Sequence, residues 1–295
     1  MSDNTTPPQL LVRYDWLHGK PNGTLFVHPA GAHYIVVSKL GNQLLLSIVD
    51  RQDPRSNFVQ TALDITQPLA LQFDYMQAML LSLLWVPQPQ RIGMLGLGGG
   101  ALPLVLHHFL PQATIDCIEI SPTVVDVARR FFGFQPDERL QLCLSDGRDF
   151  LATQTTRYDI LLMDIFLDKG QTPSHLLTIE FQQLCRQRLN DNGVLVVNIA
   201  QDGPLGAERL HTLRQVFPYV TICPVSDVTW VCFAATRPPR PGHERLTLAQ
   251  SLATQYAFPF PLHHWATKLV DSRTLPAGTN PSPPPLTDAT PSGTA

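Results

Sequence analysis

The chain has 295 residues, of which 44% are hydrophobic and 15% charged, and its formal net charge is −3. A chain of this length can bury one large domain, or one such domain with a small appendage. The slightly negative charge creates no cationic field, which excludes nucleic acid and anionic membrane surfaces as expected partners.

The beginning of the chain, its apolar stretches and its cysteines all favour a cytoplasmic protein. Residues 1–8 lack the basic and apolar regions of a signal peptide. The most apolar stretch, around residues 76–86, is interrupted by polar residues and is too short to span a bilayer. Five scattered cysteines form no C-x-x-C pair, so we expect neither a disulfide framework nor a bound metal.

The first region, residues 1–66, predicts a small antiparallel β domain. Turn signals such as Pro21-Asn22-Gly23 separate several short β-type runs. These runs are residues 10–14, 24–27, 34–39 and 43–49.

The second region, residues 67–271, predicts an α/β domain built on a doubly wound, Rossmann-like sheet. After a largely buried helix at residues 70–84, strands and helices alternate along the chain. The predicted strands are 91–97, 114–120, 140–144, 158–164 and 194–200, followed by a closing pair at 219–224 and 229–235; the predicted helices are 101–109, 122–132, 179–189 and 205–216. Residues 272–295 are rich in Pro, Thr and Ser and predict a disordered tail.

A glycine-rich loop follows the first of these strands. Gly96, Gly98, Gly99 and Gly100 lie where the chain passes from the strand into a helix. Without Cβ atoms, such a loop turns tightly and lets its amides approach a ligand closely. Glycines at the end of a strand can also form a plain turn, so the loop alone leaves both roles open.

Glu119 ends the next strand, about twenty residues after the loop. A carboxylate in this position can accept both hydrogen bonds of a ribose diol. The alternative is a solvated carboxylate at the end of a strand, but the neighbouring residues Cys117, Ile118 and Ile120 are apolar. The pattern therefore favours a nucleoside site.

Two further aspartates end the following strands. Asp146 precedes Gly147 and a helix, so it could cap that helix, accept from an adenine amino group, or do both. Asp164 follows the apolar run Ile160-Leu161-Leu162-Met163 and faces the same edge of the sheet, where it could act as a general base or steer a cationic centre. The segment 165–173, which contains Asp168, predicts a mobile loop beside this site.

Taken in order, four motifs resemble those of the polyamine aminopropyltransferases, the spermidine synthase family. They are Leu95-Gly96-Leu97-Gly98-Gly99-Gly100, Cys117-Ile118-Glu119-Ile120, Ser145-Asp146-Gly147-Arg148 and Tyr158-Asp159-Ile160-Leu161-Leu162-Met163-Asp164. The resemblance covers roughly residues 24–235. It implies the fold of S-adenosylmethionine-dependent methyltransferases, preceded by a small β domain.

The resemblance also implies roles for these residues. The family uses decarboxylated S-adenosylmethionine, transfers its aminopropyl group to an amine and releases methylthioadenosine. Carried over, Glu119 would hold the ribose, Asp146 with Gly147 would meet adenine, and Asp164 would deprotonate the attacking amine. The loop 96–100 would pack against the nucleoside. Family members are often dimers, so the resemblance allows a homodimer, although no residue of the sequence indicates one.

The departures from the family pattern fall on the side of the amine. Gly99 stands where the family has an aspartate, and Leu167 stands where it has a second one, with Asp168 one residue later. A Tyr-His-Glu of the family falls near Asp74-Tyr75-Met76, and a Gln-x-Glu matches Asn198-Ile199-Ala200. At about 1.5–3 kcal/mol for each charged hydrogen bond, losing about three carboxylates would weaken a diamine by several orders of magnitude.

Asp74, Tyr75 and Asp168 remain the candidate contacts to the acceptor. Three functions are compatible with these residues. The first is aminopropyl transfer to an amine or another nucleophile. The second is methyl transfer from S-adenosylmethionine, for which Arg148 is no clear partner of the methionine carboxylate. The third is a nucleoside-binding module without catalysis.

Overall fold

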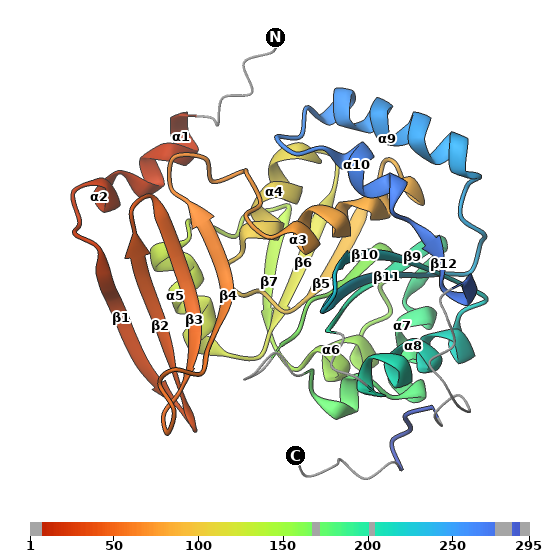
Figure 1. Ribbon diagram of the computed structural model, residues 1–295, viewed down its shortest axis with the longest axis horizontal. Helices are drawn as coiled ribbons and strands as arrows, with labels where there is room; N and C mark the ends of the chain where they lie inside the picture. Colours follow the sequence, from red (N-terminus) through yellow and green to blue (C-terminus); the bar gives the residue numbers. More distant parts are fainter. Residues whose placement is uncertain (1–7, 167–171, 201–203, 275–284, 290–295) are drawn as a thin grey trace.

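Two β-sheets lie side by side in this protein (Figure 1). The small sheet is built from the N-terminal part of the sequence and the large sheet from the part that follows. The computed structural model describes residues 8–166, 172–200, 204–274 and 285–289. The large sheet is of the doubly wound type found in S-adenosylmethionine-dependent methyltransferases, and the small antiparallel sheet precedes it.

The small sheet has four antiparallel strands in the order β1-β2-β3-β4. Their bounds are β1 Gly23–Ala30, β2 His33–Leu40, β3 Gln43–Asp50 and β4 Asn57–Asp64. The first three contain the runs predicted from the sequence, whereas β4 was not predicted.

The β-type run predicted at residues 10–14 is wrong, because short helices precede the sheet. They are α1 Pro8–Leu11, η1 Val12–Tyr14 and α2 Asp15–His18. Leu10, Tyr14 and Leu17 are buried, and their spacing of four and three residues places them on one face of a helical segment. A window of five residues was too short to reveal this period.

The large sheet has the strand order β12-β10-β11-β9-β8-β5-β6-β7. Strands β5 to β9 are parallel, and β10, β11 and β12 complete the sheet in antiparallel pairs. The bounds are β5 Arg91–Leu95, β6 Thr114–Glu119, β7 Leu140–Leu144, β8 Tyr158–Met163, β9 Leu189–Ala200, β10 Tyr219–Ser226, β11 Thr229–Ala235 and β12 Val270–Asp271. The first strand, β5, lies between β6 and β8, so the chain order reverses at its carboxyl end. Open α/β sheets bind ligands at such a point.

Helices cover both faces of the large sheet. Successive residues of a strand point to opposite faces, so apolar strands need a covering layer on each side. Ile92 and Met94 belong to the core shared with the small sheet, whereas Leu95 belongs to the core on the other face. The first core includes residues of α3 Asp74–Met79, η2 Leu80–Leu84, α4 Ala101–Phe109, α5 Pro122–Phe131, α9 Gly242–Tyr256 and α10 Leu262–Thr267. The second includes residues of α6 Gly147–Thr153, α7 Ile179–Gln187 and α8 Pro204–Val216. The helix predicted at 70–84 begins only at Asp74 and ends as the 3₁₀ segment η2.

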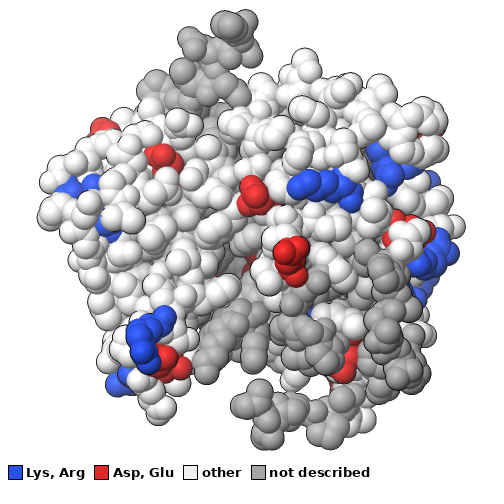
Figure 2. Space-filling model, viewed as in Figure 1, with Lys and Arg blue, Asp and Glu red and all other residues white. Residues whose placement is uncertain are grey.

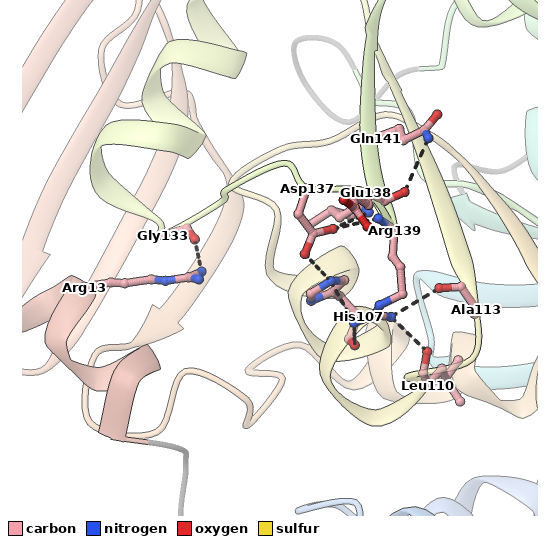
Figure 3. A network of polar contacts seen from close by, with 10 residues as sticks. Arg13, His107, Leu110, Ala113, Gly133, Asp137, Glu138, Arg139 and Gln141 are labelled. Carbon is pink, nitrogen blue, oxygen red and sulfur yellow. Dashed lines mark hydrogen bonds and ion pairs between the residues drawn. The ribbon is translucent and has the colours of Figure 1, made fainter.

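The connection between α5 and β7 is held from two sides (Figure 3). Arg13, from the helices before the small sheet, donates to the carbonyl oxygen of Gly133 at 2.7 Å. On the other side, His107 Nε2 lies 2.9 Å from Asp137 Oδ2, and Arg139 donates to the carbonyl oxygen of His107. The connection is thereby fixed both to α4 and to the N-terminal helices.

The predicted tail differs from expectation at two places. Residues 272–274 form the 3₁₀ segment η5 Ser272–Thr274. Residues 285–289 lie against α7 and α8, where Ile179 N donates to the Leu286 carbonyl oxygen at 2.8 Å and Leu286 N donates to Thr212 Oγ1 at 3.1 Å.

Among the described residues, no helix combines the length and the apolar character needed to cross a membrane. On the face drawn in Figure 2, Lys and Arg side chains lie in small separate groups.

Candidate functional site

A cavity of about 750 Å³ lies at the carboxyl edge of β5, β6, β7 and β8. Its volume is typical of small-molecule sites. The loops after these strands form one side, and the inner face of the small sheet forms the opposite side. The two sheets therefore enclose the site between them, at the point where the strand order of the large sheet reverses.

The glycine loop contributes Gly96 and Gly98 to the cavity wall. Gly96 has a φ of +91°, and a Cβ atom there would meet the carbonyl oxygen of Asp164. Only glycine therefore lets β5 and β8 end so close together.

Gly99 and Gly100, predicted to contact the nucleoside, are buried behind the loop and do not line the cavity. Gly99 N donates to Thr61 Oγ1 at 2.8 Å. A Cβ at Gly99 would lie 2.8 Å from both Phe132 Cδ1 and Thr61 Cγ2, so no side chain fits at this position without movement of its neighbours.

Glu119 is buried at the end of β6 and lines the cavity. Its carboxylate accepts hydrogen bonds from the amides of Leu97 at 3.0 Å and Ser121 at 2.8 Å. Burial raises the pKa of Glu119, and these backbone hydrogen bonds oppose that rise. The carboxylate thus holds the glycine loop in place and presents its remaining lone pairs to the cavity.

Asp146 lines the cavity beside Gly147 and also caps α6, as predicted. Its Oδ1 accepts from the amides of Arg148 and Asp149, and its Oδ2 lies 3.0 Å from His175 Nε2. Burial alone would raise the pKa of Asp146, but the hydrogen bonds from His175 and from the two amides outweigh it and lower the pKa. This carboxylate therefore stays ionised, as an acceptor for an amino group requires.

Asp164 follows β8 and is partly buried, with access to the cavity. Its carboxylate accepts from Asn198 Nδ2 at 3.0 Å and from the Tyr75 hydroxyl at 3.2 Å. Burial raises the pKa of Asp164 to about 6, although both hydrogen bonds lower it in part. A carboxylate with this pKa is ionised at neutral pH and is a stronger base than an ordinary aspartate.

The structure separates the three predicted acceptor contacts. Tyr75 lines the cavity and contacts Asp164, whereas its neighbour Asp74 is exposed at the start of α3 and does not line it. Asp168 lies outside the described residues.

Neither Asn198 nor His175 was among the predicted site residues, although Asn198 matched the first residue of the family's Gln-x-Glu. Asn198 is 6% exposed, and its Oδ1 has no hydrogen-bond partner among the described residues. Asn198 is a polar residue in the buried, apolar part of β9, and this pattern could have indicated a functional side chain. His175 offered none, because its contact with Asp146 depends on how the segment before α7 folds back.

Charge on the described cavity wall is negative. Its carboxylates are Glu119, Asp146 and Asp164, and no Lys or Arg lines it among the described residues. Arg148 is turned away from the cavity and pairs with Asp288, at 2.8 Å between Nη1 and Oδ1. Such a wall favours a cationic ligand over an anionic one.

The small sheet supplies an apolar surface opposite these carboxylates. Ile35 of β2, Ile48 of β3 and Phe58 of β4 pair across neighbouring strands, and all three line the cavity. The ring of Phe58 lies 6.1 Å from that of Phe166, two residues beyond Asp164. Gln60 Nε2 donates to the Phe166 carbonyl oxygen at 2.9 Å, which ties β4 to the segment after β8.

Comparisons with known proteins point to two kinds of transferase. A family model described as the spermine/spermidine synthase domain matches residues 77–231. The chain is 35% identical over 154 residues to a polyamine aminopropyltransferase of Vibrio vulnificus, which covers 51% of this chain and 51% of that protein. It is 28% identical over 182 residues to the human eEF1A lysine and N-terminal methyltransferase, which covers 57% of this chain and 26% of that protein.

Among solved structures, the crystal structure of human methyltransferase-like protein 13 in complex with SAH matches with a TM-score of 0.59 and 27% identity. The match covers 64% of this chain and 94% of that chain. The chain spans about half the length of the Vibrio relative and about a quarter of the human methyltransferase.

Proposed function

The chain belongs to the spermine/spermidine synthase domain family, and from this premise we propose that it transfers an aminopropyl group from decarboxylated S-adenosylmethionine to an amine. The observation that carries the proposal is the partly buried Asp164, held by Tyr75 and Asn198 at the edge of the cavity that Glu119 and Asp146 also line.

Hydrogen-bond acceptors on one side of the cavity, the nucleoside half of this proposal, support binding of an adenosyl group. Glu119 would accept from the ribose hydroxyls and Asp146 from the adenine amino group, with Gly96, Gly98 and Gly147 leaving room for close approach. His175 and the amides of α6 already hold Asp146 in one orientation. Such preorganisation reduces the entropic cost of binding.

The proposed reaction forms one bond and breaks one. The lone pair of a neutral amine attacks the methylene carbon beside the sulfonium, and the carbon–sulfur bond breaks with its electron pair moving to sulfur. Methylthioadenosine leaves as a neutral thioether. The amine proton passes to the carboxylate of Asp164, whose raised pKa suits it to accept the proton.

The negative cavity wall supports the decarboxylated form of the donor. S-adenosylmethionine carries a carboxylate, which needs a cation or free amides, and the described wall offers no Lys or Arg. The decarboxylated donor carries only positive charges, so the net negative charge of the described wall attracts it, whereas the same charge repels the carboxylate of S-adenosylmethionine.

Methyl transfer from S-adenosylmethionine is the second candidate. It is supported by the similarity to the human eEF1A lysine and N-terminal methyltransferase and to a methyltransferase-like protein solved with SAH. A primary amine would be the acceptor in this case too, so Asp164 would keep its role as base.

Calorimetric titration with methylthioadenosine, S-adenosylmethionine and its decarboxylated form separates these functions. We expect methylthioadenosine and the decarboxylated donor to bind at least tenfold more tightly than S-adenosylmethionine, and amine-dependent release of methylthioadenosine to follow. Preference for S-adenosylmethionine with transfer of its methyl group would replace the proposal by the second candidate. Binding without any turnover would leave a nucleoside-binding module.

A further inference from the structure

We propose that the acceptor is a primary monoamine with an apolar or aromatic body, whose amino group lies at Asp164 and whose body lies against the small sheet. This inference rests on the proposed function and names the substrate class of the same cavity. It follows from the distribution of charge and of apolar surface around Asp164.

Of the three described carboxylates of the cavity, the proposed function leaves Asp164 for the acceptor amine, because it assigns Glu119 and Asp146 to the nucleoside. Glu119 accepts from two backbone amides, and Asp146 accepts from α6 and His175, both within the nucleoside half. Asp164 comes two residues before Phe166, which contacts Phe58 and Gln60 of the small sheet. A second ammonium group on the acceptor would lose its hydration there without gaining a described carboxylate.

The surface opposite Asp164 is built from apolar side chains in register. Ile35, Ile48 and Phe58 are neighbours across β2, β3 and β4, so together they form a continuous strip on one face of the sheet. Phe166 extends this strip toward Asp164, and its backbone is fixed by Gln60. An aromatic or branched body can fill such a strip, and aromatic pairs add specific ring contacts.

Gln60 offers little to a second amino group. Its Nε2 donates to the Phe166 carbonyl oxygen, so only its Oε1 could accept a hydrogen bond from an ammonium group. A neutral amide oxygen compensates the desolvation of an ammonium group less well than a carboxylate does. As far as residues 8–166 and 172–200 show, the acceptor half therefore provides one charged contact and a large apolar contact.

The test is calorimetric titration of amines into the full chain saturated with methylthioadenosine. We expect 2-phenylethylamine to bind at least tenfold more tightly than 1,4-diaminobutane, which carries a second amino group on a short apolar chain. Equal or tighter binding of the diamine would overturn the inference, and so would failure of 2-phenylethylamine to bind. Titration of methylthioadenosine alone tests the proposed function itself. If methylthioadenosine does not bind, the proposed function is wrong, and not only the proposed class of acceptor.

Variants of the strip make the test specific. Phe58→Ala should weaken 2-phenylethylamine at least tenfold and leave methylthioadenosine affinity unchanged, while Val27→Ala, exposed on β1 outside the cavity, should change neither. Ile48→Glu should raise the affinity for 1,4-diaminobutane at least tenfold over Ile48→Gln, because it adds a carboxylate to the strip. Unchanged amine preferences in both Phe58→Ala and Ile48→Glu would refute the assignment of this surface.

Discussion

Asp164 combines a raised pKa with two fixed hydrogen-bond donors, Tyr75 and Asn198, at a cavity wall. We expect Asp164→Asn to reduce transfer by about 10²–10⁴, the usual contribution of a general base. Asp126→Asn, which changes an exposed aspartate of α5, serves as the matched control. Steady-state turnover measures the effect, and methylthioadenosine affinity should be retained. Turnover equal to that of the control would remove Asp164 from the role of base.

The same residue makes a prediction about stability. A carboxyl whose pKa is raised in the folded state binds its proton more tightly there than in the unfolded chain. Its stabilising contribution is therefore complete below pH about 4 and is lost as the pH rises through about 6. Between pH 4 and 7.5 the free energy of unfolding should fall by about 1–3 kcal/mol more in the native chain than in Asp164→Asn. Denaturant unfolding across this range measures it, and parallel pH profiles would contradict the raised pKa.

Which residues of the site could be predicted depends on how each is positioned. Glu119, Asp146 and Asp164 follow strands of one parallel sheet, whose carboxyl ends meet at one edge, so their proximity follows from the strand pattern. Tyr75 and Asp74 are adjacent on a helix, where successive side chains diverge by about 100°, and only the fold decides which one faces the cavity.

At the scale of elements, the segment 285–289 bears on the nucleoside half. Arg148 donates both to Asp288 and to the carbonyl oxygen of His175, and the ring of His175 contacts Asp146. Ending the chain at residue 284 should therefore free His175 and weaken methylthioadenosine roughly 3- to 10-fold, equivalent to about 0.7–1.4 kcal/mol.

Titration calorimetry on the truncated chain checks this prediction. Asp288→Asn should give a smaller loss in the same direction. Asp271→Asn, which breaks a comparable pair with Arg273 at β12, should have no effect. Full affinity in the truncated chain would show that the segment does not support the site.

The strands β5 to β11 of the large sheet were predicted to within a few residues, except that β9 begins at Leu189, because central strands buried on both faces, such as β5 and β8, are nearly continuous apolar runs. The two-residue strand β12 was not predicted. The structure at the start of the chain was not predicted correctly. A run such as Leu10-Leu11-Val12-Arg13-Tyr14 is compatible with both a strand and a helix until its packing partners are known. Strand β4 also escaped prediction, although its consecutive residues Phe58, Val59, Gln60 and Thr61 line the cavity.

For the whole molecule, the two sheets share one hydrophobic core. Leu44 and Leu46 of the small sheet belong to the same buried cluster as Ile92 and Met94 of the large one. We expect a single cooperative unfolding transition in scanning calorimetry, because neither part keeps a complete core without the other. Methylthioadenosine at about 100 times its dissociation constant should add about 2.7 kcal/mol to the free energy of unfolding.

Two separate transitions, with only the later one shifted by the ligand, would contradict this expectation. They would instead support independent units divided near residue 66, the division predicted from the sequence. Tyr14→Phe is a useful probe of the coupling, since the Tyr14 hydroxyl donates to the Phe132 carbonyl oxygen at 2.9 Å. Its loss should cost about 1 kcal/mol in a single transition.

The packing around Gly99 has a consequence for how the acceptor preference could change over time. With Phe132 and Thr61 each having an atom 2.8 Å from the place of a Cβ atom, an aspartate at this position would displace both side chains. A single Gly99→Asp exchange would therefore cost packing energy as well as add a charge, which makes this position a poor starting point for a diamine site. An acidic side chain is accommodated more readily at Ile48, which lines the cavity and is only partly buried.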